Sequence, residues 1–383
     1  MTEFVTGNRI TLLKSGAEYF PALVAEIDAA RREVHVESYI FADDATGRSV
    51  AAALARAAQR GVATHLLVDG FGSAGLDRKL VTEMEEGGVR FLCYRPRISA
   101  WPPRRGRLRR MHRKSAVVDA RVAFVGGINI EDDPVPPRFD FAVRVEGPLV
   151  ASIHRMLKRL WSLVNTTRLR ARLPDAAAIV PLAQVCGAQR AAIATRDNLG
   201  HRRDIEEAYL SAFAGARSEI LIANAYFFPG QSFRQALVEA AGRGVRVALL
   251  LQGKVEYFLQ HYASRALYGP FLDAGIEIHE YQKSFLHAKV AVVDRHWATV
   301  GSSNIDPLSL LLAREMNVLI EDEVFAAELR GSLLAAIAGD AVQVRREGWA
   351  AEPLTVRALM WASYHLARTL TGLFAYGRAE EFN

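Results

Sequence analysis

Apolar positions along the first half of the chain follow two spacings in turn, and this alternation predicts strands separated by helices. Short, nearly continuous apolar runs predict strands at residues 8–13, 34–41, 63–68 and 89–94. Apolar residues at helical spacing predict helices at residues 16–32, 50–59 and 80–86. Strands that alternate with helices in this way are typical of a mostly parallel sheet covered by helices, so the expected fold class is α/β.

The second half of the chain repeats this order of elements. Helices are expected at residues 205–216, 233–242 and 266–274, and strands at residues 219–228, 247–251 and 276–281. A repeat of this length predicts two pseudo-symmetric lobes, each with a mostly parallel β-sheet flanked by helices. The predicted division is a first lobe at residues 1–165, a linker at 166–200, a second lobe at 201–350 and a C-terminal segment at 351–383.

Each half carries the same short motif after its last predicted strand. Residues 111–129 read MHRKSAVVDARVAFVGGIN, and residues 286–304 read LHAKVAVVDRHWATVGSSN. Five fixed positions arise by chance on the order of once in millions of starting points, so two copies indicate a duplicated unit. The shared residues are His112, Lys114, Asp119, Gly126 and Asn129 in the first copy, and His287, Lys289, Asp294, Gly301 and Asn304 in the second.

The residue types in the motif suit a phosphate group. Histidine and lysine two positions apart on an extended strand point to the same side, so each pair can address one ligand. The lysines can bind phosphate oxygens, and the histidines can bond to phosphorus or move a proton. A metal is not expected here, because lysine is a poor ligand and no carboxylate cluster accompanies either histidine. The expected phosphate-binding residues also include Asn129, Asn304 and Ser302.

Two carboxylates stand 28 residues downstream of the motif histidines, Asp140 after His112 and Glu315 after His287. The matched offset predicts that each carboxylate holds one ring nitrogen of the histidine in its own half. The other ring nitrogen would then be free to react. A simple surface charge is the alternative for either acid.

One motif provides only half of a site. If the lobes pack about a pseudo-two-fold axis with the motifs facing each other, the two histidines flank one phosphorus atom. One histidine would then attack as the nucleophile, and the other would protonate the leaving alcohol. We expect Asp119 and Asp294 to support this site through hydrogen bonds in the turn after each motif strand.

Composition narrows the class of protein without choosing a substrate. The net charge is +6 and the isoelectric point is about 9.4, which is compatible with phospholipid head groups, nucleic acid or other phosphates. Two cysteines are too few for a disulfide framework. The chain has no signal-peptide pattern and no run of 18 apolar residues, so we expect no membrane-spanning helix.

Two segments are candidates for contact with an anionic membrane. Residues 95–110 contain seven arginines, three prolines and no acid, and a solvated loop is the alternative interpretation. Residues 354–376 predict an amphipathic helix that either packs on the body of the protein or lies in a membrane interface. The candidate membrane-binding residues are Trp101, Arg104, Arg105, Arg107, Arg109 and Arg110.

The two motifs resemble the signature of the phospholipase D superfamily, HxKxxxxD followed by G-[GS]-x-N. Phrases at residues 68–73, 140–148, 223–230 and 296–310 are most similar to bacterial cardiolipin synthases of the B type, which lack N-terminal transmembrane helices. The resemblance implies two phospholipase D-like lobes with the active site at their interface. It also implies phosphatidyl transfer between two phosphatidylglycerol molecules through a phosphohistidine, with His112 as nucleophile, His287 as general acid and base, and no cofactor.

The same resemblance implies anionic phospholipids as partners, namely phosphatidylglycerol and cardiolipin at a membrane surface. A peripheral position on the cytoplasmic side of the inner membrane is expected, and no nucleic acid partner is expected. A phospholipase D or nuclease remains the enzymatic alternative, because the motif itself does not separate lipid from nucleic-acid phosphodiesters. A non-catalytic protein that binds anionic membranes is disfavoured, because both motifs are complete.

Overall fold

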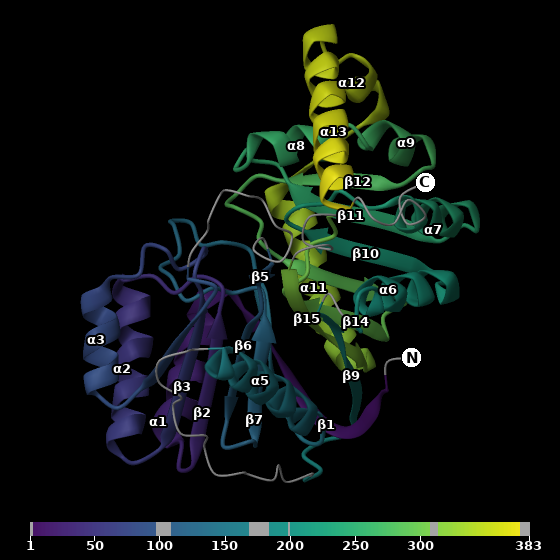
Figure 1. Cartoon of the computed structure of the whole chain (residues 1–383). Helices are drawn as coiled ribbons and strands as arrows, with labels where there is room; N and C mark the ends of the chain where they lie inside the picture. Colours follow the sequence, from purple (N-terminus) through teal and green to yellow (C-terminus); the bar gives the residue numbers. More distant parts are fainter. Residues whose placement is uncertain (1–2, 97–108, 168–183, 198–199, 307–312, 376–383) are drawn as a thin grey trace.

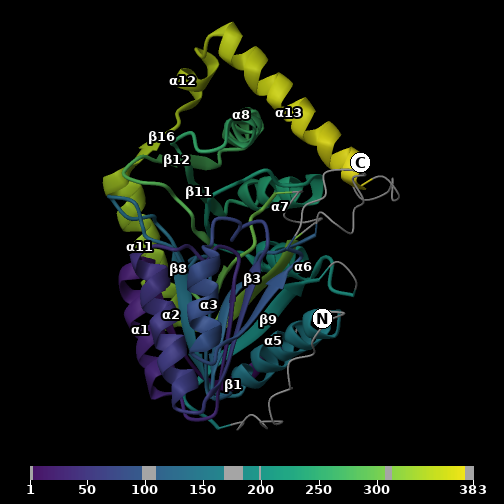
Figure 2. The ribbon, with the colours of Figure 1, turned by 60° about the vertical axis from the view of Figure 1, so that its left-hand side comes forward.

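A computed structural model describes residues 3–96, 109–167, 184–197, 200–306 and 313–375. Over these residues the strands join into one sheet of 16 strands that runs through both halves, and helices cover it (Figure 1). The predicted α/β class is therefore confirmed. The two halves lie side by side along this sheet, with the second half carrying the C-terminal helices at one end of the molecule (Figures 1 and 2).

The first half contains the predicted alternation of strands and helices, followed by the motif strands. Its strands are β1 (Val5–Lys14), β2 (Glu33–Ser38), β3 (Ala63–Asp69), β4 (Arg90–Tyr94), β5 (Arg110–Met111), β6 (Lys114–Val118), β7 (Val122–Gly126) and β8 (Phe141–Glu146). Its helices are α1 (Ser15–Ala29), α2 (Ala45–Gln59), α3 (Arg78–Glu86) and α5 (Leu149–Thr166). Helix α1 buries Tyr19, Leu23 and Ile27, which recur at helical spacing on one face.

The second half repeats this order and adds a C-terminal extension. Its strands are β9 (Gln189–Arg196), β10 (Glu219–Asn224), β11 (Arg246–Gln252), β12 (Glu277–Tyr281), β13 (Lys289–Val293), β14 (Trp297–Gly301), β15 (Ala313–Glu321) and β16 (Ala341–Gln343). Its helices are α6 (Asp204–Gly215), α7 (Gln231–Gly242), α8 (Phe258–Arg265), α9 (Tyr268–Asp273), α11 (Glu323–Asp340), α12 (Arg346–Ala350) and α13 (Leu354–Ala375). The single helix predicted at 266–274 is shorter than expected and follows a separate helix, α8.

The prediction of mostly parallel sheets is wrong. Only β2, β3 and β4, and their counterparts β10, β11 and β12, pair in parallel within each half. The motif strand β6 pairs antiparallel with both β2 and β7, and β13 does the same with β10 and β14. Helical crossovers join the parallel strands, whereas a tight turn after each motif strand returns the chain at once and therefore makes an antiparallel pair.

The two halves meet where β1 and β9 pair antiparallel at the centre of the sheet. Strand β9 lies inside the segment predicted as a linker, so residues 189–196 belong to the sheet instead. The predicted strands at 34–41 and 219–228 end early, at Ser38 and Asn224. Beyond these ends the chain leaves the ladder and makes single bridges, from Phe41 to Ile130 and from Phe227 to Ile305.

A shared hydrophobic core joins the halves. It contains buried residues of both motif strands, such as Val117 and Val290, together with Leu157 of α5 and Leu329 of α11. Separate cores lie under α1 and α2 in the first half and under α6 and α7 in the second. Because the central core draws on both halves, their relative position is fixed by packing as well as by the continuous sheet.

Helix α13 corresponds to the predicted amphipathic C-terminal segment. Met360 and Ser363 are buried on the side that faces the body, and Tyr364 packs edge-on against Phe228 at 5.4 Å between ring centroids. Trp361 and Leu366 are exposed on the other side. One side of α13 therefore packs on the body of the protein, as the first alternative predicted. The other side leaves Trp361 and Leu366 exposed to solvent. No helix among the described residues is both long and apolar enough to cross a membrane.

Candidate active site

The two motif histidines are each held by a carboxylate from the opposite half. His112 Nδ1 lies 2.9 Å from Glu315 Oε1, and His287 Nδ1 lies 2.7 Å from Asp140 Oδ2. Sequence spacing identified both carboxylates, but the prediction that each serves its own half is wrong. The crossing arises because the halves face each other, so that β8 and β15 bring their carboxylates toward the other half's motif.

Backbone contacts repeat the same exchange. The N–H of His112 donates to the carbonyl of Arg314 at 3.0 Å, and the N–H of His287 donates to the carbonyl of Phe139 at 2.9 Å. Each acceptor is the residue directly before an orienting carboxylate. The short strand β5 also pairs with β15 of the other half. Both histidines are thus fixed by main chain and side chain together, which preorganises them at the interface of the halves.

The motif lysines lie buried beside the histidines. Lys114 Nζ is 3.1 Å from His112 Nε2 and 2.9 Å from the His112 carbonyl oxygen, while Lys289 Nζ donates to the carbonyl oxygen of His287. Burial lowers the pKa of Lys114 to about 7, with the charge of Lys289 adding to the effect, and burial also lowers the pKa of Lys289, with the charge of Arg138 adding to it. A bound anion would relieve both effects, because an opposite charge favours the protonated lysines.

Burial also keeps both histidines neutral. It lowers the pKa of His112, and it lowers the pKa of His287 to about 3 with Lys289 adding to the effect. In a neutral imidazole whose Nδ1 donates to a carboxylate, Nε2 carries the lone pair. Each histidine can therefore act through Nε2 as a nucleophile or a base.

Asp119 and Asp294 lie at the far ends of the motif strands. Five residues of β6, at about 3.3 Å each, separate Asp119 from the catalytic end, and β13 does the same for Asp294. Both residues have positive φ angles, 52° and 50°, in the turn that returns the chain. Their carboxylates accept backbone N–H groups within 3.0 Å from Arg31, Arg32 and Glu33 in the first half, and from Arg217, Ser218 and Glu219 in the second. They anchor the turn and do not touch the reacting groups, which excludes direct chemistry.

The asparagines and the serine of the motif differ in their roles. The Oδ1 atoms of Asn129 and Asn304 are buried and make no hydrogen bond within the described structure. Asn129 lines the same small hollow as His287 and Asp140, and its Nδ2 donates to Glu131 at 3.2 Å. Ser302 instead donates its hydroxyl to Glu315. Direct phosphate binding by Ser302 is therefore corrected to positioning of the carboxylate that holds His112.

Residues 23–161 and 209–335 match the family described as "Cardiolipin synthase, PLD-like domain". The chain belongs to this family. It is 42% identical over 352 residues to cardiolipin synthase B of Escherichia coli K12, covering 88% of this chain and 82% of that protein. It is 31% identical over 323 residues to probable cardiolipin synthase YwiE of Bacillus subtilis 168, covering 83% and 63% respectively. These relatives confirm the resemblance inferred from the motifs.

Solved structures with a similar fold are much more distant in sequence. Phosphatidylserine synthase of Haemophilus influenzae Rd KW20 superposes with a TM-score of 0.72 at 13% identity, covering 96% of both chains. Polyphosphate kinase of Porphyromonas gingivalis superposes with a TM-score of 0.62 at 14% identity, covering 95% of this chain and 53% of that one. At such identities the likeness shows a shared fold.

Sequence reasoning missed the residues that hold the chain just before each histidine. Asp69 accepts the N–H of Met111 at 2.8 Å, and Gln252 accepts the N–H of Leu286 at 3.1 Å. Both residues end the second parallel strand of their half and precede a glycine. Their matched positions, at the last residue of β3 and of β11, were the sequence signal that could have identified them.

One aromatic contact in this member of the cardiolipin synthase family breaks the pseudo-symmetry. The ring of Tyr39 lies edge-on to His112 at 4.6 Å between centroids, and Lys114 Nζ lies 5.1 Å from the same ring. Strand register places Ala225 at the matching position of the second half. Among the described residues this ring contact is found beside His112, and it adds to the hydrogen bond from Ser302 to Glu315 as a difference between the two sides.

The structure describes only residues 95, 96, 109 and 110 of the predicted basic segment at 95–110. Trp101, Arg104, Arg105 and Arg107 lie outside the described residues. Arg110 belongs to β5, where its guanidinium lies over the Phe71 ring at 5.5 Å and 4.0 Å from Asp69. Arg110 is thus tied to the loop after β3, and membrane contact by Arg109 and the rest of the segment stays a prediction.

A second buried cluster of titratable groups lies away from the motif. Glu33, His35 and His154 bring three possible ligand atoms within 4.8 Å of one another. Burial alone would raise the pKa of Glu33, but hydrogen bonds from His154 and His35 hold it far below its usual range. Lys158 Nζ lies 3.8 Å from the same carboxylate. The residue types are those that bind zinc, yet the carboxylate is already balanced by these neighbours.

Because His35 and His65 are buried and stacked, we expect the free energy of unfolding to fall in acid. The rings lie 4.3 Å apart, Arg90 lies 3.2 Å from His65 Nε2, and burial lowers the pKa of His65 to about 3. The unfolded chain, with a histidine pKa near 6.5, takes up the proton first, so this stability is complete above pH 6.5 and declines below it. Between pH 7.5 and 5.0 the loss from His65 is on the order of 2 kcal/mol.

Urea unfolding at both pH values measures this effect. His65→Phe keeps a ring against His35 and should show a smaller difference in unfolding free energy between pH 7.5 and 5.0. His296→Phe replaces an exposed histidine and serves as the control, with an unchanged difference. An unchanged difference in His65→Phe would contradict the assignment to this ring.

Proposed function

We propose that this protein is a cardiolipin synthase that transfers a phosphatidyl group from one phosphatidylglycerol molecule to another and releases glycerol. The observation that carries the proposal is the crossed pair of histidines, each oriented by a carboxylate of the opposite half and each beside a buried lysine. Two oriented imidazoles, each beside a buried ammonium group, suit displacement at a phosphodiester, with one as nucleophile and one as general acid. Close similarity to cardiolipin synthases supports the choice of lipid substrate.

The proposed reaction has two displacements. His112 Nε2 attacks phosphorus and forms a P–N bond, the P–O bond to glycerol breaks, and protonated His287 gives its proton to the departing oxygen. The primary hydroxyl of a second phosphatidylglycerol then loses its proton to His287 and attacks the phosphohistidine. The P–N bond breaks, which restores His112 and yields cardiolipin. By analogy with the superfamily we assign the nucleophile to His112.

Charge in the pocket assists both steps. Lys114 and Lys289 would bind the non-bridging oxygens, and the side-chain N–H groups of Asn129 and Asn304 would add further donors. Burial lowers the pKa of His287, whereas a bound phosphodiester anion would favour its protonated form. Substrate binding would thereby prepare His287 to act as the general acid.

Incubation with phosphatidylglycerol vesicles, followed by mass analysis of the lipids and assay of glycerol, tests the function. Cardiolipin and glycerol should appear in equal amounts. Phosphatidic acid as the sole lipid product would identify a phospholipase D, in which water replaces the acceptor alcohol.

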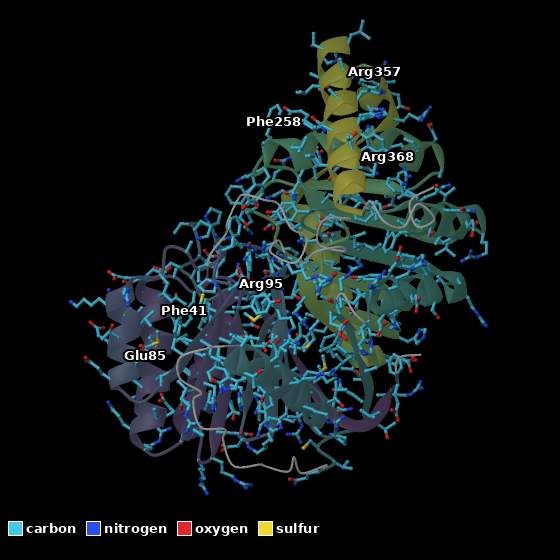
Figure 3. All side chains as sticks on the ribbon, in the orientation of Figure 1. Phe41, Glu85, Arg95, Phe258, Arg357 and Arg368 are labelled. Carbon is cyan, nitrogen blue, oxygen red and sulfur yellow. The ribbon has the colours of Figure 1, made fainter. Side chains whose placement is uncertain are left out.

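We also propose a peripheral position on an anionic membrane, on the cytoplasmic face of the inner membrane. Helix α13 exposes Trp361 and Leu366 and carries Arg357 and Arg368, and exposed Phe258 lies on the neighbouring α8 (Figure 3). Basic residues beside exposed aromatic and aliphatic side chains are typical of helices that lie in the membrane interface.

Replacing Trp361 and Leu366 by aspartate should release the protein from vesicles that contain phosphatidylglycerol. Burial of each such side chain contributes about 1.5–3 kcal/mol, so the bound fraction should fall roughly tenfold or more. Vesicle sedimentation measures the effect, with Val324→Asp as the control because Val324 is exposed on α11. Equal sedimentation of the two variants would show that α13 is ordinary surface.

A further inference from the structure

A groove of about 700 Å³ runs between α5 and β9, apart from the hollow that contains His287. Helix α5 packs alongside the sheet at the strand that joins the halves (Figure 1). The volume is in the range of sites for small organic ligands, about 300–1,000 Å³. The motif and its mechanism use none of this space.

Three arginines line the groove with donors that lack partners. Arg196 is only 6% exposed, and its Nε and Nη1 atoms make no hydrogen bond within the described structure. Arg113 is 5% exposed and also has an unpaired Nε, although its Nη2 donates to Glu37 at 2.8 Å. The Nε of Arg314 is likewise buried and unpaired. Buried guanidinium groups with unused donors indicate a missing anionic partner, because such groups are costly unless paired.

The carboxylate whose charge acts most strongly on Arg196 does not fill this role. Glu315 lies opposite Arg196 in the ladder of β15 and β9, but its two oxygens already accept from His112 and Ser302. At the outer end of the groove, Asp204 pairs with His201 at 2.7 Å. Glu315 and Asp204 are thus paired with other groups. Glu37 accepts from Arg113 and balances part of the charge of Arg113 and Arg314, but the Nε atoms of all three arginines and Nη1 of Arg196 remain unpaired for an incoming anion.

Helix α5 gives the groove four aliphatic or thioether side chains. Leu149, Met156, Leu160 and Leu163 of α5 form its apolar part, beside Ser152, Arg159, Ser162 and Thr166, and Leu163 is half exposed. A cationic end that continues into an apolar part fits a molecule with a phosphate at one end and a hydrocarbon chain at the other. A free phosphate would use only the cationic end.

We propose that this groove binds a second anionic phospholipid, with its phosphate at Arg113, Arg196 and Arg314 and an acyl chain along α5. The proposal rests on the proposed function, which requires two phospholipids in one reaction. Two of the arginines are neighbours in sequence of catalytic groups, since Arg113 lies between His112 and Lys114 and Arg314 precedes Glu315. A lipid in the groove would therefore lie directly behind the motif strands.

Binding of dihexanoyl phosphatidylglycerol below its micelle concentration tests the site. The experiment uses the full chain with His287→Ala, because this substitution prevents turnover of the lipid. Equilibrium dialysis then gives the number of lipid molecules bound per chain. Adding Arg196→Gln should reduce this number by one, and an unchanged number would overturn the proposal. Because the measurement counts bound lipid, it is independent of whether the wild-type protein forms cardiolipin from phosphatidylglycerol vesicles.

A second variant tests whether the acyl chain contributes to binding. It also keeps the proposal testable if the Arg196→Gln variant does not fold. Leu163→Glu places a charge on the apolar part of the groove, and it should weaken groove binding of the lipid about tenfold. Val238→Glu changes a comparably exposed residue on α7 and should leave the binding unchanged. Glycerophosphoglycerol, which lacks acyl chains, should bind more weakly than the lipid. Equal binding of the two ligands, or equal affinity in both glutamate variants, would overturn the assignment to a lipid.

Discussion

Replacing His112 or His287 by alanine is expected to abolish cardiolipin formation, with a fall in rate on the order of 10⁴-fold or more. Without His112 no P–N bond can form, and without His287 no group remains to protonate the leaving glycerol. The fold should persist, because the backbone N–H groups of both histidines keep their acceptors across the interface. Lipid mass analysis measures the rate, and circular dichroism checks the fold.

The two alanine variants should differ in one respect. With a phosphatidyl ester whose leaving group needs no proton, His287→Ala should still form the covalent phosphohistidine, whereas His112→Ala should not. Mass analysis of the peptide that contains residue 112 detects the adduct. An adduct on residue 287 would reverse the assigned roles, and full transfer activity in either variant would contradict a two-histidine mechanism. His296→Ala, which replaces an exposed histidine away from the site, provides the control.

Replacing Glu315 by glutamine is expected to lower kcat roughly 10²- to 10⁴-fold while the protein stays folded. The amide can donate to Nδ1 of His112, which moves the ring proton to Nε2 and removes the lone pair needed for attack. The same argument applies to Asp140→Asn and His287. The expected change is in kcat, because the lysines that bind the phosphate are untouched. Asp294→Asn is the matched control, since it alters a motif carboxylate that only anchors a turn.

Double-mutant cycles on unfolding free energy test the crossing of the carboxylates. The pair His112 and Glu315 should show a coupling of about 0.5–3 kcal/mol, as expected for residues in direct contact. The pair His112 and Asp140, which share a half but do not touch, should be additive. Coupling within the same half would contradict the exchange between halves seen in the structure.

The sequence by itself determined the duplication, the α/β class and the membership of the catalytic set. Spacing in one dimension was enough, because a motif strand with His and Lys two residues apart must present both on one side. The matched offset of 28 residues also identified Asp140 and Glu315 as a pair. These features follow from local geometry and from comparison of the two halves with each other.

Only the tertiary structure decided which carboxylate serves which histidine. Each half alone could have closed on itself, and the sequence offset favoured that arrangement. The pairing of β1 with β9 and the shared core instead turn the two motifs toward each other, so each half completes its site with a carboxylate from its neighbour. Contacts across an interface depend on relative orientation, which spacing within one half does not encode.

The same reason explains the other differences. The prediction of parallel pairing was wrong at the motif strands, because a turn anchored by Asp119 or Asp294 reverses the chain at once. The groove with unpaired Arg196 could not be anticipated, because β9 was placed in a linker and its partners are 100 or more residues away. The local pattern of residues determined which segments form helices and strands. Packing between the two halves determined which side chains from those segments meet at the active site and in the groove.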